Sequence, residues 1–112
     1  MQFYHNPRCR KSRETLQLLY SKGLQPKIVE YLDQVPTQKE IKGILKKLGV
    51  TAEELVRKNE ALYKKEFKDK DYSEDEWIRI LSDYPRLIER PILITEEKAA
   101  LGRPPENVLS IL

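Results

Sequence analysis

The stretch QFYHNPRCRKSRETLQLLY, residues 2–20, predicts a strand, a turn and a helix in immediate succession. Residues 2–5 form a strand-like run, which Asn6-Pro7 ends by starting a turn. Apolar residues then recur at helical spacing, namely Leu16, Leu19 and Tyr20. We expect this helix over about 9–21 and a second strand over 27–32. Strand, helix and strand in this order indicate a βαβ unit with a parallel pair of strands.

The middle of the chain is predicted to be helical. Three capping boxes, each a threonine or serine followed three residues later by glutamate, mark helix starts: Thr37–Glu40, Thr51–Glu54 and Ser73–Glu76. The segment 58–72 is rich in mixed charge, and we interpret it as a solvated helix or loop.

The pattern returns to β-structure after Pro85. Residues 92–94 are a short apolar run, with which 98–101 could pair as a hairpin. Proline suits the first position of a helix, so Pro104-Pro105 predicts a last short helix. We expect its buried side to consist of Val108, Leu109 and Leu112.

This order of elements is typical of one α/β fold class. The chain shows βα-β, then a helical insertion at about residues 37–85, then ββα. This is the thioredoxin-like arrangement, a small mixed four-stranded sheet flanked by helices. At 112 residues we expect a single domain, 1–112.

The composition excludes several classes of protein. A net charge of +3, from 21 basic and 18 acidic residues, is too small to indicate nucleic-acid binding by itself. There is no apolar run of membrane-spanning length, and the N-terminus lacks the pattern of a signal peptide. One cysteine cannot form an internal disulfide, which fits a reducing cytosol.

That cysteine, Cys9, is the first candidate for chemistry. It is predicted at a helix N-terminus, where unpaired N–H groups and the helix dipole stabilise a thiolate. The same N–H groups bind anions, so the turn suggests chemistry on an oxyanion. A single cysteine can also be a small buried hydrophobic residue, and one Cys with one His lacks the spacing of a metal site.

Five other residues complete the candidate site. His5 could favour the Cys9 thiolate or only pack at a strand end, and Ser12 could donate its hydroxyl to the thiolate or be an ordinary first-turn residue. Three arginines stand in distinctive contexts, although any one of them could be a surface charge: Arg57, Arg90 and Arg103. Pro91 is expected to face the cysteine, often with a cis peptide bond in this fold. The basic residues nearest Cys9 are expected on the solvated side of the turn: Arg8, Arg10, Lys11 and Arg13.

Four separated motifs resemble the glutaredoxin-coupled arsenate reductases of the ArsC/Spx-like family. They are HNPRCRKSRETL at 5–16, LVRKN at 55–59, ERPI at 89–92 and GRPPENVL at 102–109. The resemblance implies that Cys9 is the nucleophile, that His5 helps to lower its pKa, and that the Ser12 hydroxyl lies near the thiolate. It also implies that an arginine triad binds the oxyanion and the covalent arsenic intermediate: Arg57, Arg90 and Arg103.

The function implied by this resemblance is cytoplasmic reduction of arsenate to arsenite, in arsenic detoxification. Glutathione is then the co-substrate, glutaredoxin is the protein partner, and we expect a monomer with no bound cofactor or metal. Phosphatase-type arsenate reductases need C-x5-R, but the residue six after Cys9 is Thr15. Spx-type regulators share the fold and bind RNA polymerase, and their redox-switching members have C-x-x-C where this chain has Ser12. A redox-silent protein-interaction module is the alternative function.

Overall fold

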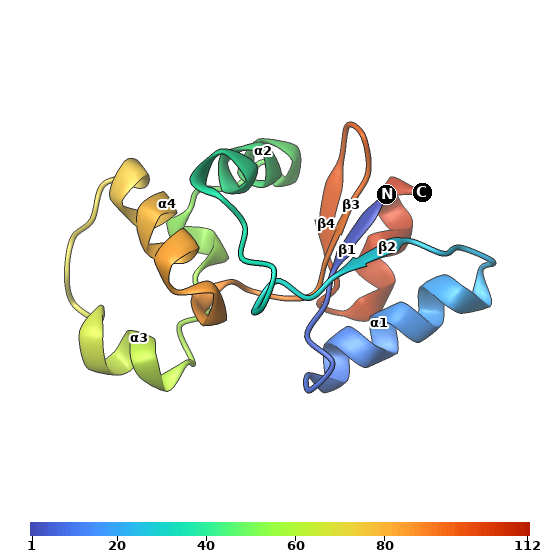
Figure 1. Cartoon of the computed structure of the whole chain (residues 1–112), viewed down its shortest axis with the longest axis horizontal. Coiled ribbons are helices and arrows are strands. Elements are labelled where there is room, and N and C mark those ends of the chain that lie inside the picture. Colours follow the sequence, from blue (N-terminus) through green and yellow to red (C-terminus); the bar gives the residue numbers. More distant parts are fainter. The chain divides into compact units, whose positions relative to one another are not determined.

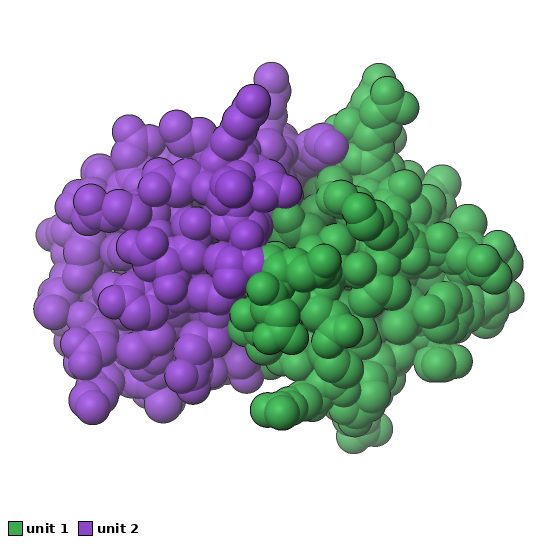
Figure 2. Space-filling view, viewed as in Figure 1, with its two compact units in different colours: residues 1–34, 90–112 green, residues 35–89 purple.

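A computed structural model describes residues 1–112, which divide into two compact units. The first unit contains residues 1–34 and 90–112, and the second contains residues 35–89 (Figure 2). The helical insertion expected at about residues 37–85 falls within the second unit. No helix is long and apolar enough to cross a membrane.

The first unit is a mixed four-stranded sheet with two helices (Figure 1). Its elements are β1 (Gln2–Tyr4), α1 (Arg10–Ser21), β2 (Lys27–Val29), β3 (Ile92–Ile94), β4 (Ala99–Leu101) and the 3₁₀ helix η3 (Pro105–Ile111). The strand order is β2-β1-β3-β4, with β1 and β2 parallel and the other pairs antiparallel. The predicted βαβ unit, the hairpin and the thioredoxin-like α/β fold are therefore confirmed.

One face of this sheet is covered by α1 and η3. Phe3, Leu93 and Ala100 are neighbours across three adjacent strands and form one buried cluster with Leu19 of α1 and Val108 of η3. Leu19 and Val108 are completely buried. Since burial of such a side chain contributes about 1.5–3 kcal/mol, this cluster fixes α1 and η3 against the sheet.

Two side chains expected on buried helix faces are exposed instead. The buried positions of α1 are Ser12, Thr15 and Leu19, so Tyr20 points away from them and is 44% exposed. The last helix is 3₁₀ rather than α, and its repeat of three residues places Val108 and Ile111 on one side. Leu112 is therefore 52% exposed.

The second unit is helical. Its elements are α2 (Gln38–Leu48), the 3₁₀ helix η1 (Glu53–Leu55), α3 (Ala61–Glu66), α4 (Glu74–Asp83) and the 3₁₀ helix η2 (Pro85–Leu87). Complete capping boxes at Thr37 and Ser73 begin α2 and α4, as predicted. The box at Thr51 starts only η1, because Val56 leaves the helical conformation and forms a β-bridge with Ile88.

The interpretation of residues 58–72 as a solvated segment is wrong for its aromatic side chains. Phe67 is buried, and it contacts Trp77 and Tyr84. Tyr63 and Tyr72 also pack against the Trp77 ring. The charged residues of this segment are solvated, while its aromatic residues form an aromatic cluster with α4.

A glycine allows β4 and η3 to be joined close to α1. The N–H of Gly102 donates to the carbonyl oxygen of Pro91 at 2.9 Å. A Cβ atom at Gly102 would lie 2.8 Å from both Pro91 Cγ and Thr15 Oγ1, closer than side chains tolerate. The peptide bond before Pro91 is cis, as expected for this fold, and the Arg103–Pro104 bond is also cis.

We predict that Gly102→Ala destabilises the protein by about 1–3 kcal/mol, the usual cost of forcing extra atoms into a packed site. Urea-induced unfolding would measure this change. Gly43→Ala is the matched control, because nothing lies within 4 Å of a Cβ there and alanine favours a helix interior. If Gly102→Ala were as stable as the parent, the close approach would be contradicted.

Candidate active site

Cys9 lies at the junction of the β1–α1 turn and the helix, as the sequence predicts. It is the N-cap residue of α1, with an extended backbone (φ −92°, ψ 124°), and its side chain makes no capping hydrogen bond. Its own N–H donates to the carbonyl oxygen of Asn6 at 2.9 Å, and its carbonyl accepts from the N–H of Arg13 at 3.0 Å. The turn thus holds the half-buried thiol at the positive end of α1, whose first turn contains no acidic residue.

The Arg103 side chain lies beside the Cys9 sulfur. Its Nη2 lies 3.7 Å from Cys9 Sγ, and its Nε donates to the carbonyl oxygen of Arg90 at 2.7 Å. Asn107 Nδ2 donates to the carbonyl oxygen of Arg103 at 2.9 Å. Asn107 is not among the predicted site residues, although it lies in the motif GRPPENVL, four residues after Arg103.

Arg57 belongs to the second unit, and its predicted role stays a prediction. Its backbone N–H donates to the carbonyl oxygen of Leu87 at 2.7 Å. Its guanidinium forms an ion pair with Glu60 at 3.1 Å, and Glu60 also pairs with Arg86 at 3.1 Å. The Arg57 side chain is therefore held by a carboxylate within its own unit.

His5 and Ser12 form a buried pair beneath the turn. His5 Nδ1 lies 2.6 Å from Ser12 Oγ, and the N–H of Asn6 donates to the same oxygen at 3.0 Å. Ser12 is completely buried, and His5 Nδ1 is the only acceptor within reach of its hydroxyl proton. The hydroxyl therefore donates to His5 Nδ1, which leaves the histidine proton on Nε2. This pair ties strand β1, the turn and α1 together.

The environment lowers the pKa of the Cys9 thiol below its ordinary value. Burial acts in the opposite direction, but it is outweighed by the backbone N–H of Ser12, the charge of Arg90, the backbone N–H of Lys11 and the charge of Arg103. Ser12 thus acts on the sulfur through its N–H. The nearby positive charges that act on the thiolate belong to Arg90 and Arg103, whereas Arg8 and Arg10 are exposed, as expected.

Burial lowers the pKa of His5, although the Glu30 carboxylate partly offsets this effect by favouring the charged ring. His5 is therefore neutral at pH 7. No group of three or more His, Cys, Asp or Glu side chains is arranged to hold a metal ion.

Comparisons with known proteins agree with this fold. The model of the ArsC family matches residues 4–111. An arsenate reductase of Haemophilus influenzae is 48% identical over 97% of this chain and 96% of its own length. A protein of Escherichia coli named "Uncharacterized protein YfgD" is 46% identical over 100% of this chain and 96% of its own. The structure of an arsenate reductase from Vibrio cholerae superposes with a TM-score of 0.93 at 41% identity, covering 100% and 98% of the two chains.

The fold and the cysteine at the start of α1 define a thioredoxin-like protein with one candidate nucleophile. Given the match over nearly all of its length, the chain belongs to the ArsC family.

We predict that the Cys9 thiol titrates at a lower pH in the folded protein than in the same chain unfolded by denaturant. The thiolate then persists to a lower pH than in the unfolded chain and is lost as the pH falls through the lowered pKa. Ultraviolet absorbance of the thiolate measures both midpoints. Arg103→Ala should move the folded midpoint upward, because it removes a positive charge close to the sulfur.

The matched control is Arg10→Ala. Arg10 is adjacent to Cys9 in sequence, but its side chain is 85% exposed and paired with Glu14. An equal shift in both variants, or no difference between folded and unfolded midpoints, would contradict this account of the site.

Proposed function

We propose that this protein reduces arsenate to arsenite, with Cys9 as nucleophile and glutathione and glutaredoxin as reductants. The observation that best supports the proposal is the Arg103 guanidinium 3.7 Å from the Cys9 sulfur at the start of α1. A nucleophile and a cationic anion-binding group in one place suit attack on an oxyanion. The names of the relatives, arsenate reductase in Haemophilus influenzae and in Vibrio cholerae, support the same activity.

In the first step, the Cys9 thiolate attacks arsenic and displaces water or hydroxide, which forms a sulfur–arsenic bond. Arg90 and Arg103 neutralise the oxyanion and the charge that develops on it. Arg57 is proposed as the third member of this set. The planar guanidinium suits the task, because it donates two parallel hydrogen bonds to an oxyanion.

Reduction of As(V) to As(III) requires two electrons, which two thiols supply together. Glutathione attacks the Cys9-bound arsenic, and the sulfurs of Cys9 and glutathione end as a mixed disulfide. Per turnover, one Cys9 thiol, one glutathione and one arsenic acid give this disulfide, one arsenous acid and one water. Glutaredoxin then takes the glutathionyl group by thiol–disulfide exchange and restores the Cys9 thiol.

The second thiol has to come from another molecule. Cys9 is the only cysteine, and the nearby Ser12 offers a hydroxyl that cannot form a disulfide. We propose a cytoplasmic monomer, since the cytoplasm keeps glutathione reduced. His5 and Ser12 are proposed to support the thiolate by fixing the turn around Cys9.

We predict that the protein reduces arsenate only when glutathione and glutaredoxin are both supplied. With arsenate and glutathione but no glutaredoxin, intact-mass analysis should show one glutathione adduct at Cys9, because the next step lacks its thiol. Cys9→Ser should show neither turnover nor adduct. Efficient turnover with thioredoxin alone, without glutathione, would contradict the mechanism, and absence of turnover would favour a protein-interaction module.

We also predict that Arg90→Ala, Arg103→Ala and Arg57→Ala each lower kcat/KM for arsenate at least about tenfold, or roughly 1.4 kcal/mol of transition-state stabilisation. Arg103→Lys should also be impaired, because an ammonium lacks the planar fork of guanidinium. The thermal midpoints should change little. Arg79→Ala, at an exposed position of α4, is the matched control and should keep the parent kinetics. Unchanged kinetics in all three alanine variants would exclude the proposed arginine set.

A further inference from the structure

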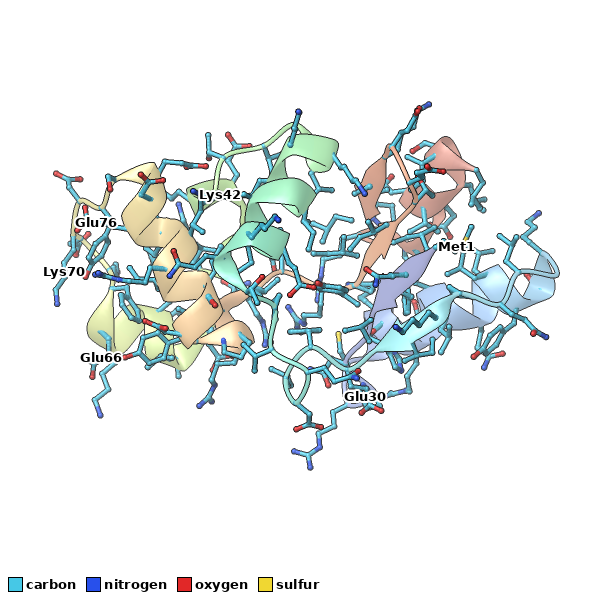
Figure 3. The ribbon with its side chains drawn as sticks, turned by 45° about the horizontal axis from the view of Figure 1, so that its top comes forward. Met1, Glu30, Lys42, Glu66, Lys70 and Glu76 are labelled. Atoms are coloured by element: carbon cyan, nitrogen blue, oxygen red, sulfur yellow. The ribbon has the colours of Figure 1, made fainter.

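A cavity of about 360 Å³ lies against the turn that holds Cys9. Its volume is in the range of small-molecule sites. One wall is the turn itself, with His5, Asn6 and Arg8, and the other wall follows the end of β2, with Glu30 and Asp33. Figure 3 labels Glu30 at this end of the strand. The two walls are joined by a hydrogen bond from the N–H of His5 to the carbonyl oxygen of Val29 at 2.9 Å.

The cavity is lined by a hydrogen-bond donor of a largely buried residue. His5 is only 7% exposed, and its Nδ1 is engaged by the Ser12 hydroxyl. Its Nε2–H has no hydrogen-bond partner within the protein, although His5 lines the cavity. Because this N–H forms no hydrogen bond within the protein and is not fully buried, it is available to a ligand acceptor in the cavity.

Three charged side chains around the cavity are also without ion pairs. The Arg8 guanidinium and the carboxylates of Glu30 and Asp33 form none within the protein. By contrast, Arg10 and Arg57 are each paired with a glutamate three or four residues away. The cavity therefore offers one cation and a neutral N–H donor for a carboxylate, together with two carboxylates for an ammonium group.

These groups complement an α-amino acid, which has an ammonium and a carboxylate on one carbon atom. We propose that the cavity binds the γ-glutamyl end of glutathione, with its ammonium at Glu30 and Asp33 and its carboxylate at Arg8 and His5 Nε2–H. This inference rests on the proposed function, in which glutathione is the second thiol. The N–H of Cys9 donates to the carbonyl oxygen of Asn6, which lines the cavity, so the proposed site lies beside the turn that carries the nucleophile.

Kinetics with two thiols test the cavity. In Glu30→Gln, Asp33→Asn and the double variant, KM for glutathione should rise about three- to tenfold, because each change removes a carboxylate partner of the ammonium. KM for arsenate should not change. With 2-mercaptoethanol, a thiol without the α-amino acid group, the variants should behave like the parent. Glu96→Gln and Glu97→Gln, at exposed positions between β3 and β4, are the matched controls.

Binding without turnover supplies the second readout. His5 is the only histidine, so its ring resonances are assigned directly in NMR spectra. Titration with S-methylglutathione, which cannot react, should shift these resonances saturably in the parent and require several times more ligand in the double variant. If the His5 resonances did not shift, or if the KM for glutathione were unchanged in an active enzyme, the proposed glutathione site would be contradicted. The proposed function would not be affected by either result. A saturable shift in a protein without arsenate turnover would reject the function and support the cavity.

Discussion

The close contact at Gly102 is the constraint on which the geometry around Cys9 depends. It joins the chain after β4 to Thr15 on α1 and to Pro91, so the next residue, Arg103, must lie near the start of α1. Arg103 is then oriented through two further bonds, from its Nε to the Arg90 carbonyl and from Asn107 to its own carbonyl. Its guanidinium therefore reaches the Cys9 sulfur without bringing an acidic partner with it. A larger residue at position 102 would move Arg103 away from the nucleophile.

Local patterns in the sequence were enough to predict most of the fold. The β1–α1 turn and the boxes at Thr37 and Ser73 formed as expected, because each depends on residues close together in the chain. Errors occurred where distant residues decide the outcome. Glu74 accepts the N–H of Ala52 from another helix, and η1 ends in the Val56–Ile88 bridge, so the box at Thr51 is followed only by a short 3₁₀ helix.

The candidate site also combines features that local sequence determines with features that depend on residues distant in the chain. The helix N-terminus explains why Cys9 was identified as a candidate, since that effect is local. The hydroxyl of Ser12 could not be assigned from spacing alone, because its position relative to His5 depends on how β1 packs beside α1. In the structure, the Ser12 hydroxyl is hydrogen-bonded to His5, whereas the Ser12 backbone N–H stabilises the Cys9 thiolate. One residue thus serves the turn with its side chain and the thiolate with its backbone.

The three longest helices differ in how the N–H groups of their first turns are capped, and the exception is the helix that begins at Cys9. The side chains of Thr37 and Ser73 cap α2 and α4, and acidic residues occupy their first turns. The first helix, α1, has no side-chain cap hydrogen bond and no acid in its first turn, with Cys9 at the capping position. A capping oxygen there would stabilise the helix by about 1 kcal/mol and occupy the N–H groups that now stabilise the thiolate. Among these three helices, only α1 lacks a side-chain cap, and it begins at the only cysteine of the chain. A negatively charged sulfur then completes the cap, which links ionisation of Cys9 to the local stability of α1.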